Sequence, residues 1–513
     1  MLSAEADVLI IGGGMAAAWA AVGAARAGAN VVMVDKGAVG TSGVTATAGP
    51  NHWWVAPAQR EQAVTQRLTQ SLGLGEAPWM HRILEQTWES LPTLSRFYQF
   101  CVNDSGVTVY NSVRGPEYMR ALRQYVESLG VRIFDHSPAL ELLLQSGAAA
   151  GARGERLQAR EEWEIRAPAV ILATGGCGFN GALLGSRTNT GDGYLMAAET
   201  GVALSGMEFS SQFTVAPAFS TMTRAMSYVY ATYYDASGRV IEPAGDIQRL
   251  RFLAEALRIG PVYCDFSRMP QDIRERLPTI SPNVLPVFHR QRIDPFTDRF
   301  PIALVSEGTI RGVGGLVVES EDCETSTPGL FAAGDAASRE AVTGAISGGG
   351  AVNSAWALSS GIWSGRAAAR LAKQHGARRG AVERTGQAGL RPRQLVRAIN
   401  SSALPANVRD QATDFSTTFF RDASSLGRAL NVLDGQWNEI GEHLAGGLRA
   451  REAAALTATA RWSLTAALYR RESRGIHARE DFPAAAPHLA KRQVLRGLDS
   501  IETSFAQAGE LAA

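Results

Sequence analysis

A glycine-rich stretch near the N-terminus combines residue types and spacing that could bind the pyrophosphate of a dinucleotide. The segment GGGMAA places Gly12, Gly14 and Ala17 in the pattern GxGxxA. In this pattern the first glycine permits a tight turn, the second lets the backbone approach a pyrophosphate, and the third small residue lets a helix pack on a strand. Asp35 follows after about 20 residues, the separation at which a carboxylate can accept hydrogen bonds from a ribose. We therefore expect a dinucleotide site.

The elements around these residues occur in the order that such a site needs. Residues 7–11 (DVLII) form a short apolar run, typical of a parallel strand buried on both faces. Alanine-rich sequence then predicts a helix that ends at Gly28, and residues 30–34 predict a second strand directly before Asp35. The N-terminus of the predicted helix faces the phosphates, whose negative charge it stabilises.

Two later segments could add strands to the same sheet. Residues 169–176 (AVILATGG) and 329–335 (GLFAAGD) are apolar runs that end in small residues. Each run alone is compatible with an ordinary core strand. Their combination with the N-terminal pattern favours an α/β fold built around a cofactor.

Length and composition limit the class of protein. With 513 residues we expect two or three domains and a core large enough for a cofactor. The formal net charge is +1, and 45% of the residues are hydrophobic. These values argue against disorder and against a surface that binds nucleic acid.

The cysteines and the N-terminus exclude further classes. Cys101, Cys177, Cys264 and Cys323 lie far apart without a CxxC motif, which argues against an iron–sulfur cluster, structural zinc or attached haem within the chain and favours buried free thiols. The first residues lack a basic n-region, and no uncharged apolar run is long enough to span a bilayer. We therefore expect a cytoplasmic protein without a membrane span or a bound metal.

Motifs along nearly the whole chain resemble one flavoprotein family. They are DVLIIGGG, VDK at 34–36, ILATGG, TGDG at 190–193, MEF at 207–209, LFAAGD and ESRGIHAREDFP at 472–483. In this order they resemble the flavoprotein subunits of succinate dehydrogenase, fumarate reductase, L-aspartate oxidase and adenylylsulfate reductase. The resemblance implies an α/β fold, with a Rossmann-like FAD-binding domain, an inserted α+β capping domain and a C-terminal helical domain. The implied boundaries are 1–205 and 310–372 for the FAD-binding domain, 206–309 for the cap, 373–393 for an exposed linker and 394–513 for the helical domain.

The same resemblance implies which residues hold FAD. The ADP half is held by Gly12, Gly14, Ala17 and Asp35, and the adenine side is lined by Ala173, Thr174 and Gly175. Lys36, Thr41 and Ser42 lie beside the pyrophosphate and ribityl, Gly334 and Asp335 bind near the same groups, and Asp192 also holds the cofactor. The pair Asn353 and Ser354 is followed by a helix whose N-terminus points at the flavin pyrimidine ring. Membrane succinate dehydrogenases attach FAD through a histidine in an SHT segment. Gly43 stands at the corresponding place here, so we expect noncovalent FAD.

The dicarboxylate-binding residues of the family are missing. Its FHPT motif reads SQFT at 211–214, its HxxMGG motif reads IRGVGG at 310–315, and its RGEGG motif has no counterpart in the cap. The arginine of its GANRLGGNS motif falls in residues 344–354, which carry serine and glycine instead. Because a site built for two carboxylates needs these cations and histidines, we expect a substrate other than succinate, fumarate or aspartate.

Several residues near the expected flavin ring remain as catalytic candidates. Arg311 lies one residue from the family's histidine position, where a fixed cation could bind an anionic substrate, and Asn51 follows the TSGVTATAG loop. His289 and Arg290 lie late in the cap. His52, Trp53, Trp54, Tyr228 and Tyr230 are weaker candidates, because residues of these types in such positions also serve as core.

The C-terminal region is predicted to be structural. Leu426, Leu430, Leu433, Trp437 and Ile440 recur at the spacing of an amphipathic helix that packs on a core. Arg474, His477 and Arg479 are interpreted as cations that neutralise carbonyl groups at a helix end.

Three functions are compatible with this pattern. The leading one is an FAD-dependent oxidoreductase that transfers hydride or electrons between flavin N5 and a small substrate. The second is a protein that resembles the α subunit of adenylylsulfate reductase, and it would receive electrons from a small ferredoxin-like partner. The third is a catalytically silent flavin-binding assembly protein.

Overall fold

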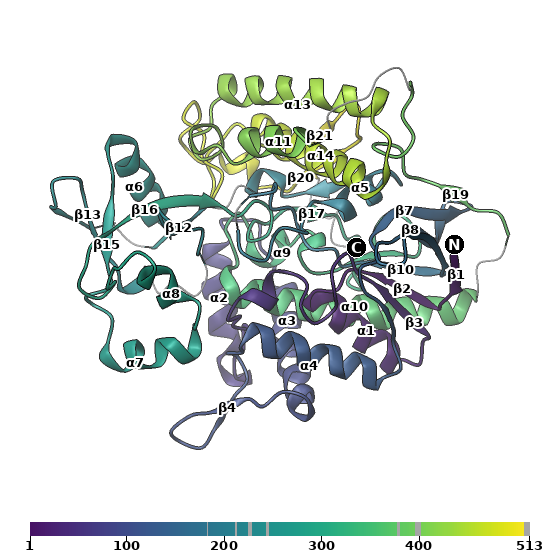
Figure 1. Ribbon diagram of the computed structural model, residues 1–513, viewed down its shortest axis with the longest axis horizontal. Helices are drawn as coiled ribbons and strands as arrows, with labels where there is room; N and C mark the ends of the chain where they lie inside the picture. The colour runs from purple at the N-terminus through teal and green to yellow at the C-terminus, as the bar shows by residue number, and fades with distance from the viewer. Residues whose placement is uncertain are drawn as a thin grey trace. The chain divides into compact units, whose positions relative to one another are not determined.

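The computed structural model describes residues 1–181, 183–210, 213–223, 228–242, 246–376, 380–394 and 402–506. The chain divides into two compact units (Figure 1). The larger unit contains Met1–Asn180, Gly185–Gln212 and Gly308–Ala513, and the smaller contains Gly181–Leu184 and Phe213–Glu307. The expected division of the chain into five segments stays a prediction.

The larger unit is built on a parallel sheet with the strand order β18-β10-β2-β3-β6. These strands are β2 (Val8–Ile11), β3 (Val31–Val34), β6 (Arg132–Phe134), β10 (Ala169–Leu172) and β18 (Leu330–Ala332). Because all five run in the same direction, their carboxyl ends meet at one edge of the sheet. The four strands predicted from apolar runs, β2, β3, β10 and β18, are confirmed and are fully buried. Strand β6, which was not predicted, is partly exposed.

Helices α1 (Met15–Arg26) and α10 (Gly349–His375) pack closely against each other. A Cβ on Gly361 would lie 2.5 Å from the carbonyl oxygen of Ala16, and one on Gly365 would lie 2.1 Å from that of Ala20. Glycine is therefore required where these two backbones meet. The contact fixes the direction of both helices relative to the sheet edge.

A second sheet in the larger unit was not predicted. It has the order β1-β9-β8-β7-β19, with β1 (Leu2–Glu5), β7 (Ala139–Gln145), β8 (Ala148–Arg156), β9 (Glu161–Arg166) and β19 (Glu383–Arg384). Strand β19 falls within the expected linker 373–393, of which residues 377–379 lie outside the described residues.

The described part of that linker is bound to strand β7. Arg384 and Arg391 both form ion pairs with Glu141, whose side chain is 2% exposed. The backbone N–H of Thr385 also donates to the carbonyl of Leu142. This part of the chain is therefore bound to β7, although both residues of β19 are exposed, and the linker stays a prediction.

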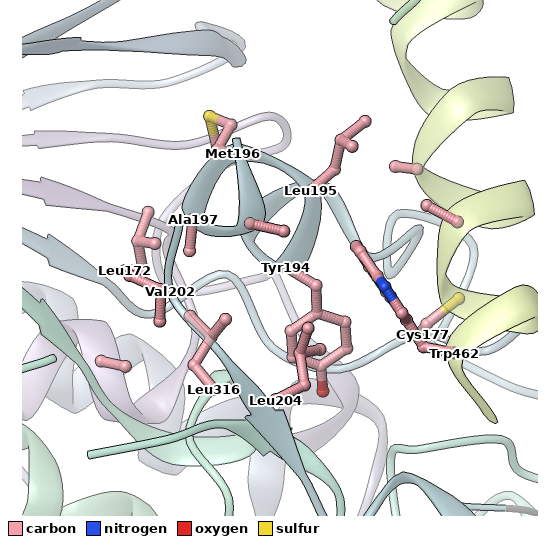
Figure 2. Packing of buried hydrophobic residues seen from close by; sticks show 14 of the residues in the cluster. Leu172, Cys177, Tyr194, Leu195, Met196, Ala197, Val202, Leu204, Leu316 and Trp462 are labelled. Carbon is pink, nitrogen blue, oxygen red and sulfur yellow. The ribbon is translucent and has the colours of Figure 1, made fainter. Parts of the chain in front are cut away.

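The C-terminal helices α13 (Ala423–His443) and α14 (Gly447–Tyr469) cover part of the larger unit. All five residues of the predicted stripe on α13 are buried, which confirms that this face is core. Helix α14 is buried on most sides. Figure 2 shows Trp462 of α14 and Tyr194 of α5 (Asp192–Ala198) among the apolar side chains of this core.

The smaller unit has an antiparallel sheet of order β12-β16-β15-β13-β14. Its strands are β12 (Phe213–Pro217), β13 (Thr232–Tyr234), β14 (Val240–Ile241), β15 (Tyr263–Asp265) and β16 (Phe300–Ser306), accompanied by α6 (Asp246–Ile259), α7 (Gln271–Ile280) and α8 (Val284–His289). This α+β composition agrees with the expected fold of an inserted cap.

One sequence expectation for a single residue was wrong, and it concerns a cysteine. Tyr228 and Tyr230 lie on a short 3₁₀ helix, and Tyr233 and Tyr234 lie on β13. Cys101 is exposed, whereas the other three cysteines are buried free thiols as expected. Among the described residues, no helix has both the length and the apolar character needed to cross a bilayer.

Candidate functional site

The carboxyl edge of the parallel sheet is lined by glycines that leave no room for side chains. Gly12 has a φ of +127°, and a Cβ there would lie 2.2 Å from the carbonyl oxygen of Ala173, which follows β10. A Cβ on Gly13 would lie 2.6 Å from Cγ of Asp35, which follows β3. The ends of β2, β3 and β10 are thus drawn together around the glycine turn.

Gly14 differs from its neighbours because it faces open space. It is the N-cap of α1, and an added Cβ would meet no atom within 4 Å. No side chain caps this helix end. The first N–H groups of a helix have no partner within the helix and carry its positive dipole end, so they can bind an anion such as a pyrophosphate.

Asp35 is held in place at the end of β3. Its side chain is buried, and Oδ2 accepts hydrogen bonds from the Ser42 hydroxyl and, at 3.1 Å, from the Gly37 N–H. Burial raises the pKa of Asp35, and the two hydrogen bonds to the carboxylate offset part of this effect. Since both bonds fall on Oδ2, Oδ1 can accept hydrogen bonds from a ribose.

Lys36 is not directed at a phosphate in this structure. Its Nζ donates to Thr190 Oγ1 at 2.6 Å, to Asp192 Oδ2 at 2.6 Å and to Glu452 Oε1 at 2.8 Å. Burial lowers the pKa of Lys36, but the charges of Asp192 and Glu452 outweigh burial and raise it. The three bonds use all the ammonium donors, so Lys36 joins α5 to α14 through Asp192 and Glu452 and has no donor left for a cofactor.

Buried polar atoms without a partner among the described residues lie at three predicted cofactor positions. They are Oγ1 of Thr174, Oδ1 of Asp192 and both amide atoms of Asn353. Buried polar groups in native proteins are nearly always hydrogen-bonded, so such atoms mark groups that bind a ligand or water. Together with the space in front of Gly14, they fit a bound dinucleotide.

The other expected cofactor residues occupy different environments. Gly175 has a φ of +76°, and a Cβ there would lie 2.4 Å from Nδ2 of Asn189. Thr41 is exposed, and its hydroxyl donates to the carbonyl of Ala38. Asn353 and Ser354 lie inside α10, which begins at Gly349, so the expectation that the helix follows this pair is corrected by four residues.

Arg339 belongs to this region and was missed by sequence reasoning. Its Nη1 donates to Asp335 Oδ1 at 2.6 Å, and its Nε donates to the carbonyl of Gly312 at 2.9 Å. Its Nη2 donates to the carbonyls of Thr309 and Ile310 at 3.0 and 3.1 Å. The side chain is 0% exposed. The sequence carries a weak signal, because Asp335 and Arg339 are four residues apart.

The catalytic candidates are distributed over both compact units. Arg311 is half-buried on the turn that Arg339 holds, and Asn51 is exposed in an isolated bridge with Ser112. His289 ends α8 in the smaller unit, and both it and Arg290 are exposed. Ser211 and Gln212 of the altered FHPT segment lie outside the described residues.

His52 is a buried neutral histidine. Its Nε2 lies 3.3 Å from the Tyr118 hydroxyl, which accepts a hydrogen bond from Trp19 Nε1 of α1 at 2.9 Å. Burial lowers the pKa of His52 to about 3. His52 therefore stays uncharged at neutral pH and cannot serve there as a cation for an anionic substrate.

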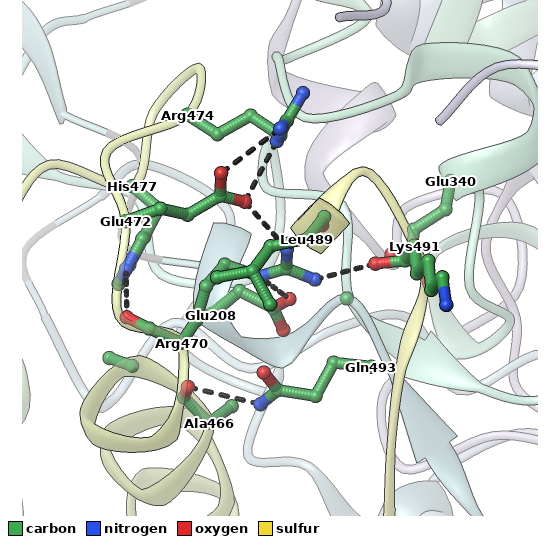
Figure 3. Close-up of polar contacts among 12 residues, drawn as sticks. Glu208, Glu340, Ala466, Arg470, Glu472, Arg474, His477, Leu489, Lys491 and Gln493 are labelled. Carbon is green, nitrogen blue, oxygen red and sulfur yellow. Dashed lines mark hydrogen bonds and ion pairs between the residues drawn. The ribbon is translucent and has the colours of Figure 1, made fainter. Parts of the chain in front are cut away.

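The ESRGIHARE segment forms a buried network of charges at the end of α14 (Figure 3). Arg479 Nη1 donates to the carbonyls of Ala467 and Leu468 at 2.8 and 3.0 Å, and Nε2 of His477 lies 3.1 Å from the carbonyl of Arg470. The interpretation of Arg479 as a cation that binds carbonyls at a helix end is confirmed. His477 also lies against a carbonyl, but burial lowers its pKa well below the usual value, so the expectation of a cation there is wrong. Arg474 instead pairs with Glu472.

Glu340 of α9 (Glu340–Thr343) lies fully buried beside this network. Burial, and then the charge of Glu208, raise the pKa of Glu340 to about 7. The folded protein therefore binds a proton between the unfolded pKa of 4.5 and about 7, and the stability gained from that proton is lost as the pH rises through this window.

Replacing Glu340 by glutamine should remove this dependence. In the wild type the free energy of unfolding should fall by on the order of 3 kcal/mol between about pH 5 and about pH 8 because of this group, and in Glu340→Gln it should fall by much less. Urea unfolding at the two pH values measures both changes. Parallel pH profiles of variant and wild type would assign the proton to another group.

Comparison with known proteins gives matches over nearly the whole chain. Residues 7–352 match the family model described as FAD binding domain, and residues 445–496 match the model described as fumarate reductase flavoprotein C-term. L-aspartate oxidase of Mycobacterium leprae is 29% identical, with 96% of each chain covered. One chain of the fumarate reductase (CoM/CoB) of Methanothermobacter marburgensis is 26% identical, with 96% of this chain and 97% of that protein covered.

Solved structures share the fold. A quinol-fumarate reductase has a TM-score of 0.82 at 19% identity, with 99% of this chain and 98% of that chain covered. Adenylylsulfate reductase of Archaeoglobus fulgidus has a TM-score of 0.78 at 18% identity, with 99% and 96% covered.

Proposed function

Since the chain belongs to the FAD-binding flavoprotein family, whose members are FAD-dependent oxidoreductases, we propose that it transfers hydride or electrons between flavin N5 and a small substrate other than succinate, fumarate or aspartate. One observation carries this proposal. Gly12, Gly14 and Asp35 lie at the carboxyl edge of the parallel sheet, with open space at Gly14. At the positions of the family's motifs, the chain lacks the arginines and histidines that would clamp a dicarboxylate.

Residues of this chain would bind the pyrophosphate, the ribose and further polar groups of FAD. The N–H groups at the start of α1, behind Gly14, would bind the pyrophosphate, and Oδ1 of Asp35 would accept hydrogen bonds from the ribose. The buried polar atoms of Thr174 and Asn353 would form hydrogen bonds with the cofactor. When bound, FAD supplies a ring that accepts or gives a hydride. Because Gly43 stands at the position of the family's linking histidine, the cofactor would be noncovalent.

Arg311 is the residue that would recognise the substrate. Arginine stays protonated at all relevant pH values and binds anionic oxygens through a planar fork. Its turn is anchored from the buried side by Arg339, so the cation would be presented at a fixed place. The substrate would therefore carry an anionic group.

Redox competence of the bound flavin tests this proposal. We expect acid to release FAD from the purified protein, and we expect the bound flavin to be reduced by a low-potential viologen dye and reoxidised by ferricyanide. The catalytically silent alternative predicts a bound flavin that exchanges electrons with neither dye. Absence of FAD, or such an inert flavin, would overturn the proposal.

A second candidate is a protein that exchanges electrons with a small ferredoxin-like partner. It is permitted by the cysteines, which are far apart and form no motif that binds an iron–sulfur cluster, and it is compatible with the same missing dicarboxylate residues. Anaerobic mixing with a reduced bacterial-type ferredoxin distinguishes the two. Reduction of the flavin faster than by the free viologen dye would favour the partner.

A further inference from the structure

Arg339 is a buried cation that joins two segments with different expected tasks. One is the segment after β18, where Asp335 is expected to bind the ribityl or pyrophosphate of FAD. The other is the turn 309–312, which carries Arg311. A single guanidinium contacts the carboxylate of the first segment and three backbone carbonyls of the second.

The chemistry of this contact makes it specific for arginine. The planar guanidinium has donors on three nitrogens in a fixed fork, and here all three nitrogens are used. Asp335 supplies the balancing negative charge at 2.6 Å. A lysine would keep the charge, but its compact ammonium could not reach the carboxylate and three carbonyls at once.

The backbone of the turn 309–312 is closely packed against its neighbours. A Cβ on Gly312 would lie 2.8 Å from Cα of Ser210. The Tyr194 hydroxyl lies 3.2 Å from Oγ1 of Thr309 and donates to the carbonyl of Asp335 at 2.7 Å. The side chains of Arg339 and Tyr194 therefore both join the turn to the Asp335 segment. Of these two, Arg339 is the one that contacts the Asp335 carboxylate.

We propose that Arg339 is a positioning residue that couples the cofactor carboxylate Asp335 to the turn 309–312, so that the bound cofactor and the cation Arg311 are fixed by one guanidinium. This inference rests on the proposed function. It assigns to Arg339 the role of setting both the affinity for FAD and the order of the turn that presents Arg311, although it contacts neither the cofactor nor the substrate directly.

The test compares the FAD-loaded wild type with Arg339→Lys, Asp335→Asn and the double variant. We expect Arg339→Lys to weaken FAD binding by about 10-fold, within the usual range of coupling between sites. In the Asp335→Asn background the same substitution should change the dissociation constant by less than about 2-fold, because the carboxylate through which Arg339 acts is absent. Flavin fluorescence titration gives all four constants.

Hydrogen exchange provides a second readout that does not depend on the substrate. We expect amides of residues 309–312 to exchange about 10-fold faster in both single variants than in the wild type, since either change frees the guanidinium from one side. Asp335→Asn alone keeps the proposal testable if Arg339→Lys does not fold.

Arg451 offers a matched control. Its side chain is 1% exposed, pairs with Glu199 and donates to the carbonyls of Leu140 and Ala388 at 2.8 Å, so Arg451→Lys loses a similar set of bonds. We expect it to lower the melting temperature without changing FAD affinity or the exchange of residues 309–312. Equal effects of Arg339→Lys and Arg451→Lys, or additive effects of Arg339→Lys and Asp335→Asn, would overturn the coupling. A wild type that binds no FAD would instead refute the proposed function.

Discussion

Replacing Gly14 by valine should leave the fold intact and weaken FAD binding by at least about 100-fold, equivalent to roughly 3 kcal/mol. An added Cβ meets no protein atom within 4 Å, so the apoprotein has room for the side chain. The φ of −78° and ψ of −172° suit any residue. The same space is where the pyrophosphate would approach the start of α1, so the valine would displace it.

The experiment is a flavin titration combined with thermal unfolding of the apoprotein. Gly435→Val is the matched control, because Gly435 lies on α13, also faces open space and is far along the chain from the glycine turn. We expect both variants to melt close to the wild type and only Gly14→Val to lose FAD. Wild-type affinity in Gly14→Val would mean that the cofactor does not pass in front of α1.

Replacing Arg470 by methionine should lower the free energy of unfolding by about 3–5 kcal/mol. Its guanidinium donates to Glu208 Oε1 at 2.7 Å and to Glu472 Oε1 at 2.8 Å, and all three side chains are 0% exposed (Figure 3). It also donates to the carbonyls of Leu489 and Lys491. Methionine would fill much of the space but leave the buried carboxylate of Glu208 without this ion pair, while Glu472 would keep its pair with Arg474.

Urea unfolding measures this loss. The double variant Arg470→Met with Glu208→Gln should recover part of it, because the charge of the carboxylate that lost its arginine is removed. Arg409→Met is the control, since Arg409 is 47% exposed and its ion pair with Asp410 spans 3.5 Å. A loss below about 1 kcal/mol for Arg470→Met, no larger than for an exposed pair, would show that the network does not hold this region together.

The sequence predicted the parts of the fold in which local pattern and tertiary position agree. The apolar runs of β2, β3, β10 and β18 are buried on both faces, as such strands require, and all but β3 are followed by small residues. The stripe on α13 was recognisable for the same reason, since its spacing matches a helix with one buried face.

Other elements could not be predicted because tertiary contacts override local preference. Strand β8 has the sequence AAAGARGER, which is rich in residues that disfavour strands, and it exists through its pairing with β7 and β9. At the site, Lys36 was assigned to the pyrophosphate by resemblance, whereas its partner Glu452 lies more than 400 residues later. Arg339 was missed because its carbonyl partners leave no trace in side-chain patterns.

Reoxidation of the reduced protein by fumarate tests the central claim most directly. The holoprotein is reduced without oxygen, mixed with fumarate and followed by the visible absorbance of the flavin, with ferricyanide as the control that proves the flavin can be oxidised. We predict that ferricyanide restores the oxidised spectrum at once and that fumarate leaves the flavin reduced. Rapid reoxidation by fumarate would contradict the claim that the pocket has changed and would show that other residues bind dicarboxylates.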